Sequence, residues 1–89
     1  MRLVVTPRFE RAAKKLHKSE KEALDDAVRA IAANPEIGGM KKGDLAGVRV
    51  YKYRHHAHLV LLAYRVAGAE ESIKLLAFGS HENFYRGLK

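Results

Sequence analysis

The sequence lacks cysteine altogether and has no long apolar run. Without cysteine the chain can form neither a disulfide framework nor a thiolate metal site, which fits a reducing compartment. No apolar stretch approaches the roughly 20 residues that a membrane-spanning helix needs. The run in "MRLVVTPRFER" is too short for a signal peptide. We therefore expect a cytoplasmic protein with no membrane partner.

Acidic residues are also scarce, with 10 Asp and Glu against 17 Lys and Arg, so the formal net charge is +7. Residues 47–89 hold four of the five histidines and only 3 of the 10 acidic residues. Histidine titrates near neutral pH. A basic surface of this kind favours an anionic partner, either nucleic acid or an acidic protein. The alternative is a basic surface that serves solubility alone.

The length of 89 residues predicts a single domain spanning residues 1–89. Hydrophobic residues make up 47% of the chain and charged residues 30%, a balance that is typical of globular proteins. Such a chain can build one core between two layers of secondary structure.

The first half of the chain predicts a strand followed by two helices. Thr6 is a suitable N-cap for the first helix and Pro7 a suitable first helical residue. The "SEKE" stretch, Ser19 to Glu22, predicts a capping box for the second helix, which should end before Pro35. Two helices this close in the sequence indicate an αα-hairpin. Their apolar stripes are Phe9, Ala12, Ala13 and Leu16, then Leu24, Ala27, Val28 and Ile31.

The second half predicts a sheet. Residues 36–47 are interpreted as a loop, and "VRVYKYR", "HLVLLAYRV" and "SIKLLAF" as three successive antiparallel strands. A short helix should follow from about Ser80. The fold class is therefore α+β, with both helices covering one face of a mostly antiparallel sheet. In the first of these strands, Arg49, Tyr51 and Tyr53 should share the open face.

Three stretches resemble the RelE/ParE superfamily of toxins from bacterial type II toxin–antitoxin modules. They are "LAGVRVYKYR", "LVLLAYRV" and "LLAFGSHENFYRGLK", and they follow one another in the order expected for that family. The resemblance spans nearly the whole chain. It implies a RelE-like, microbial-RNase-like fold in which the first strand lies beside the last.

The resemblance also implies a function. Members similar to RelE or YafQ are ribosome-dependent endoribonucleases that cut mRNA, and a cognate antitoxin neutralises them. Members similar to ParE inhibit DNA gyrase instead. We therefore expect a cofactor-free mRNA endoribonuclease with an antitoxin, the ribosome and mRNA as partners. The alternatives are a ParE-like gyrase inhibitor and a degenerate member that only binds its antitoxin.

The C-terminal tail resembles that of YafQ-like enzymes, which carry a histidine followed four residues later by an aromatic residue. His81 and Tyr85 match this pair. RelE-like enzymes carry an arginine inside the third strand, where this chain has Leu61. YafQ-like enzymes also have a histidine and an aspartate between the second and third strands, where this chain has "HHAH" and no aspartate.

The chemistry of RNA cleavage assigns roles to these residues. Without a metal, an enzyme must deprotonate the 2′-OH, protonate the leaving 5′-oxygen and stabilise charge on the phosphate. We predict that His81 moves a proton, Tyr85 positions the phosphate or stacks on a base, and Arg49 binds the phosphate. The alternatives are a capping role for His81, packing for Tyr85 and a solubilising role for Arg49.

Four further residues are predicted to contact RNA: Lys52, Arg54, His58 and Arg86. The "HHAH" stretch raises the possibility of a metal site. However, two histidines without a nearby cysteine, aspartate or glutamate make a poor zinc site. We therefore predict no metal.

Overall fold

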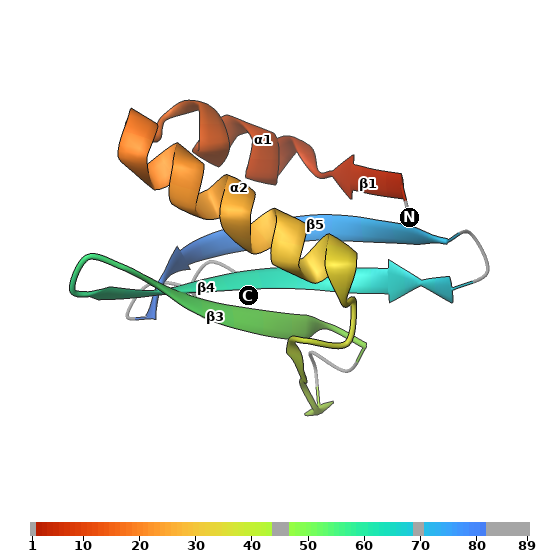
Figure 1. The fold of residues 1–89 in the computed structure, drawn as a ribbon. Coiled ribbons are helices and arrows are strands. Elements are labelled where there is room, and N and C mark those ends of the chain that lie inside the picture. Colours follow the sequence, from red (N-terminus) through yellow and green to blue (C-terminus); the bar gives the residue numbers. More distant parts are fainter. Residues whose placement is uncertain (1, 44–46, 69–70, 82–89) are drawn as a thin grey trace.

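The computed structural model describes residues 2–43, 47–68 and 71–81. Five strands form one sheet in the order β1-β5-β4-β3-β2, and two helices lie together on one face of it (Figure 1). This arrangement confirms the predicted α+β class. The elements are β1 (Arg2–Val5), α1 (Pro7–Lys14), α2 (Lys18–Ala33), β2 (Gly39–Met40), β3 (Arg49–His55), β4 (His58–Ala67) and β5 (Ser72–Ser80).

The start of α1 is the predicted one. The Thr6 hydroxyl accepts a hydrogen bond from the backbone N–H of Phe9 at 3.1 Å, and Pro7 is the first helical residue. The same hydroxyl donates to the Leu76 carbonyl at 3.0 Å. One side chain therefore caps the helix and also attaches it to β5.

The start of α2 differs from the prediction. The helix begins at Lys18, and its N-cap is His17 rather than Ser19. The backbone N–H of His17 donates to Glu20 Oε1 at 3.2 Å. Glu20 stands three residues after His17, which is the spacing that lets a carboxylate reach back to the first free N–H. The predicted apolar stripe is confirmed, because Leu24, Ala27 and Ile31 are buried.

The sheet is antiparallel except for β1, which pairs in parallel with β5. The prediction of an unbroken loop over residues 36–47 is wrong in one detail. Gly39 and Met40 form β2 and pair with Val50 and Arg49. A strand of two residues has too little alternation to be recognised in a sequence.

A register shift interrupts the pairing of β4 with β5. Ala63 pairs with Ala77 and Tyr64 with Leu75, so Leu76 is an extra residue in β5. This is the pattern of a β-bulge, which leaves one residue out of the ladder. The carbonyl of Leu76 is the group that accepts from Thr6. The bulge thus provides the attachment point for the start of α1.

The predicted orientation of β3 is wrong. Tyr51 and Tyr53 pack against the helix-side core, whereas Val48 and Val50 join Leu61 and Ala63 in a second cluster on the open face. Alternation along the strand therefore places Lys52 and Arg54 on the open face and Arg49 on the helix side. Both faces of this strand carry apolar residues, so alternation separates the faces without showing which one the helices cover. The helix-side core comprises Phe9, Leu24, Ala27, Ile31, Leu62, Tyr64, Ile73 and Leu75.

Candidate active site

Three strand ends meet at one edge of the sheet. His58 begins β4 and pairs with His55 across the hairpin turn. Ser80, the last residue of β5, pairs with Val60 two residues further along β4. His81 follows directly, so the sheet brings residues 55–60 next to residues 80–81.

A shallow hollow at this edge holds two of the histidines. We call it the histidine hollow, and its lining residues are Ala57, His58, Leu59, Ser80 and His81. Both imidazoles are exposed, so both can reach a bound substrate. Two imidazoles in one hollow can supply a proton acceptor and a proton donor for general acid–base catalysis.

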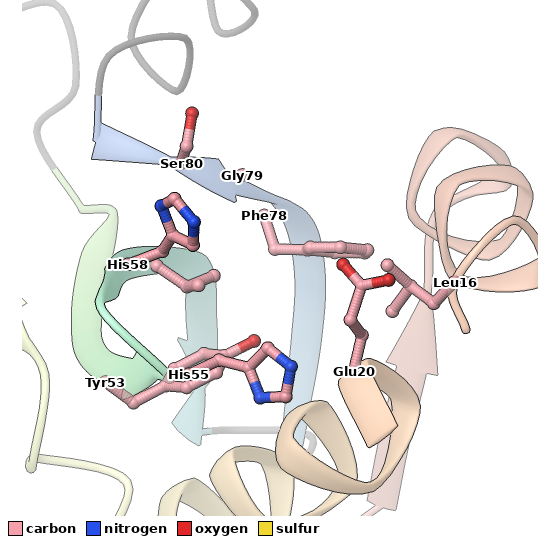
Figure 2. A pocket seen from close by; sticks show the side chains of 9 residues that line it. Leu16, Glu20, Tyr53, His55, His58, Phe78, Gly79 and Ser80 are labelled. Atoms are coloured by element: carbon pink, nitrogen blue, oxygen red, sulfur yellow. The ribbon is translucent and has the colours of Figure 1, made fainter. Parts of the chain in front are cut away.

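A second hollow of about 250 Å³ lies beside the first, on the helix side of the sheet. We call it the aromatic hollow (Figure 2). It shares His58 and Ser80 with the histidine hollow. The turn between α1 and α2 forms one of its walls and the ends of β3, β4 and β5 form the others. Its lining residues are Leu16, Glu20, Tyr53, His55, His58, Val60, Phe78, Gly79 and Ser80.

Two aromatic rings of this hollow are held by neighbouring rings. Phe78 packs edge-on against Phe9, with ring centroids 5.1 Å apart. Tyr53 stacks on Tyr51 with centroids 6.2 Å apart. Burial, and then the negative charge of Glu20, raise the pKa of Tyr53 to about 12. The Tyr53 hydroxyl is therefore protonated at neutral pH and can donate a hydrogen bond.

Lys52 and Arg54 lie on β3, which ends at this edge of the sheet. Arg54 pairs with Leu59, which lines the histidine hollow, and Lys52 pairs with Leu61 further along the strand. Both side chains are exposed. Strand pairing thus puts Arg54 beside Leu59 of the histidine hollow. Arg54 also lines a separate hollow against α2, together with Ala23, Asp26, Ala27, Tyr51 and Tyr53.

Arg49 lies at the other end of β3. Its Nη1 donates to the carbonyl oxygens of Gly38 at 2.8 Å and Glu36 at 3.3 Å. Tyr53 stands four positions further along the strand, a span of about 13 Å. The structure does not bring Arg49 beside His81 and instead shows it holding the segment that follows α2. Its predicted role at the phosphate stays a prediction.

Other predicted site residues have different outcomes. The structure brings His58 and His81 together, with Arg54 on the adjoining strand. Tyr85, Arg86 and most of the expected C-terminal helix lie outside the described residues, and β5 itself continues to Ser80. Sequence reasoning missed Glu20 and Phe78 as lining residues. Glu20 lies inside the predicted Ser19–Glu22 capping box but has no role in that prediction. The strand pattern accounts for Phe78, so neither residue pointed to a site.

The part of the chain that the structure describes holds neither a cluster of metal-ligating side chains nor a helix that could span a membrane. Within residues 2–43, 47–68 and 71–81, no three His, Asp or Glu side chains are grouped so that they could hold a metal ion. Among the same residues, neither helix has the length and apolar character needed to cross a membrane.

Comparison with known proteins gives one family and several solved structures. Residues 3–89 match the family described as "ParE-like toxin of type II bacterial toxin-antitoxin system". No curated protein sequence matches significantly. The fold is similar to the Escherichia coli RelE toxin in its RelBE complex, with 19% identity and a TM-score of 0.72 over 88% of this chain and 93% of that one.

Two further solved structures share the fold. The isolated E. coli RelE toxin is 19% identical, with a TM-score of 0.70 over 89% of this chain and 82% of that one. The Mycobacterium tuberculosis RelBE2 toxin–antitoxin complex is 18% identical, with a TM-score of 0.72 over 90% and 96% of the two chains. These likenesses confirm the RelE-like fold.

Proposed function

We propose that this chain, which belongs to the ParE-like toxins of type II bacterial toxin–antitoxin systems, is a ribosome-dependent mRNA endoribonuclease. In this proposal it acts in the cytoplasm, inhibits translation, and is held inactive by a cognate antitoxin. Solved relatives of the same fold include toxin–antitoxin complexes, which supports an antitoxin as partner.

The observation that carries the proposal is that His58 and His81 line one exposed hollow, next to the strand that carries Arg54. His81 takes the proton of the ribose 2′-OH, whose oxygen attacks the adjacent phosphorus. His58 protonates the departing 5′-oxygen. The P–O5′ bond breaks as the new P–O2′ bond forms, which leaves a 2′,3′-cyclic phosphate and a 5′-OH. Arg54 and Lys52 contact the phosphates.

The predicted residues beyond this hollow keep supporting roles in the proposal. Tyr85 and Arg86 follow His81 by four and five residues, a spacing that suits them to contact the same nucleotide or its phosphates. Arg49 is proposed to contact a part of the RNA strand that lies away from the cleaved bond. Stabilising the extra negative charge on phosphorus is the main electrostatic requirement of this reaction.

A test in cells follows growth and translation after expression of the toxin. Pulse labelling should show that methionine incorporation falls together with growth, without an induced DNA-damage response. His81→Ala should restore incorporation at matched protein level. His56→Ala is the matched control, because His56 is an exposed histidine in the turn just before His58 but does not line the histidine hollow. Continued incorporation during growth arrest would contradict the proposal.

A second candidate is inhibition of DNA gyrase, which the ParE-like description of the matching family favours. A gyrase inhibitor needs a binding surface but no proton-transferring pair. Supercoiling by purified gyrase separates the two candidates. Inhibition that is equally strong with the parent protein and with His81→Ala would support this second candidate.

A further inference from the structure

We propose that the aromatic hollow is a nucleobase site selective for guanine, which seats the RNA nucleotide next to the cleaved bond. The identification of the ligand as part of an RNA rests on the proposed function. The site itself rests on the size of the hollow, its two aromatic walls and one carboxylate.

The size and walls of the hollow suit one flat ring system. Its volume of about 250 Å³ is below the roughly 300–1,000 Å³ of pockets for drug-sized ligands. Figure 2 shows the rings of Phe78 and Tyr53 on opposite sides of the opening. Phe9 packs edge-on against the Phe78 ring, and Tyr51 stacks on the Tyr53 ring. Stacking on fixed aromatic rings is the common way in which proteins bind an unpaired base.

The carboxylate of Glu20 selects among the bases. Glu20 is half-buried, and its carboxylate reaches into the hollow on the Phe78 side (Figure 2). One oxygen accepts from the His17 N–H, but an ionised carboxylate has about four acceptor positions. Guanine offers two adjacent donors, N1–H and the N2 amino group, to the two oxygens. Adenine and cytosine offer one amino group, and uracil offers one N–H.

A second polar group supports the same ligand. The Tyr53 hydroxyl is protonated at neutral pH and, with the base stacked on Phe78, can donate to a carbonyl oxygen or ring nitrogen at the edge of the base. A guanine presents both kinds of acceptor, at O6 and N7. The hollow therefore combines an acceptor-only group with a donor, which matches a base that has donors and acceptors side by side.

The position of the hollow connects it to the proposed chemistry. His58 and Ser80 line both hollows. A base seated between Phe78 and Tyr53 places its own ribose and 3′-phosphate at this shared boundary, close to His58 and His81. One nucleotide can then occupy the aromatic hollow with its base and the histidine hollow with its sugar and phosphate.

Titration of the purified full-length chain with nucleoside 3′-monophosphates tests the site without the ribosome. We expect guanosine 3′-monophosphate to bind about tenfold more tightly than the adenosine, cytidine and uridine compounds, in line with the discrimination of a bidentate contact. Glu20→Gln should abolish this preference. Glutamine at this position preserves the cap, because its amide oxygen can still accept from His17. Glu22→Gln, in the same turn but outside the hollow, should keep the preference.

The outcome for the site is separate from the outcome for the nuclease. Selective binding that depends on Glu20 supports the site even if the protein cuts no RNA. Equal affinity for all four nucleotides, or a guanine preference that survives Glu20→Gln, overturns it even if cleavage is observed. The site is also overturned if no nucleotide binds. Weakening of the antitoxin complex by Glu20→Gln would then show that the hollow serves a protein partner.

Discussion

Tyr64 is the largest fully buried side chain among the described residues, and its hydroxyl makes two hydrogen bonds inside the protein. It donates to the Pro35 carbonyl at 2.7 Å and accepts from the Gly38 N–H at 2.9 Å. A Cβ atom at Gly38 would lie 2.7 Å from this hydroxyl, so glycine permits the close approach. A single residue of β4 thus fixes the path of the chain after α2.

We predict that Tyr64→Phe lowers the free energy of unfolding by about 1–3 kcal/mol, because it leaves a backbone N–H and a carbonyl without their partner. Urea denaturation measures this change. Tyr51→Phe is the control, because Tyr51 is only half-buried, and we expect a change below about 0.5 kcal/mol. Equal effects of the two substitutions would show that the two hydrogen bonds contribute little.

The raised pKa of Tyr53 predicts that the protein loses stability at alkaline pH. Its pKa is raised from the ordinary value of 10.0 to about 12, first by burial and then by Glu20. The folded state favours the protonated phenol. The contribution of Tyr53 to the free energy of unfolding is therefore fully present below pH 10 and is lost as the pH rises through about 12. The free energy of unfolding should fall more steeply over that interval in the parent than in Tyr53→Phe. Parallel curves would contradict the assignment.

At the scale of elements, Thr6 joins α1 to the bulge of β5 through its two hydrogen bonds. We predict that Thr6→Val destabilises the protein by about 1–2 kcal/mol, the usual cost of losing an N-cap. Thr6→Ser keeps the hydroxyl and should lose much less. Thermal and urea unfolding of the two variants measure the difference. An equal loss in both would contradict the prediction, because it would show that the hydroxyl contributes no more than the methyl group that serine lacks.

The order and type of the larger elements are predictable from the sequence because each has a strong local signal. Thr6 and Pro7 mark a helix start, and the apolar stripe of α2 has helical spacing. The orientation of β3 is not predictable in this way, because Val48 and Val50 on one face are as apolar as Tyr51 and Tyr53 on the other. The docking of α2 decides between the faces, and that contact is formed by distant residues.

The candidate site is predictable only in part. His81 and His58 belong to recognisable motifs, and the pairing of β4 with β5 brings them together. Glu20 and Phe78 reach the same edge of the sheet from α2 and β5. Nothing in their local sequence sets them apart, because their proximity depends on how the helical hairpin sits on the sheet. Arg49 shows the reverse case. Its neighbours in the sequence suggest a nucleic-acid-binding residue, but its side chain donates to two backbone carbonyls.

At the scale of the whole molecule, the net charge of +7 predicts that association with an acidic antitoxin depends on salt. Electrostatic attraction accelerates the encounter of oppositely charged proteins and is screened at high ionic strength. We expect the association rate constant to fall by on the order of tenfold between about 50 and about 500 mM salt. Stopped-flow mixing measures it. A rate that is independent of salt would show that the positive charge does not guide the antitoxin.

The central claim is that this toxin cuts mRNA on the ribosome with the histidine pair of its exposed hollow. The most direct measurement incubates the purified protein with ribosomes carrying a defined mRNA and follows the appearance of cut ends. We predict cleavage that leaves 2′,3′-cyclic phosphate and 5′-OH ends. His81→Ala should slow it by about 10²–10⁴-fold, and His56→Ala should leave it unchanged. Intact mRNA with the parent protein, or equal cleavage rates for the parent and His81→Ala, would contradict the claim.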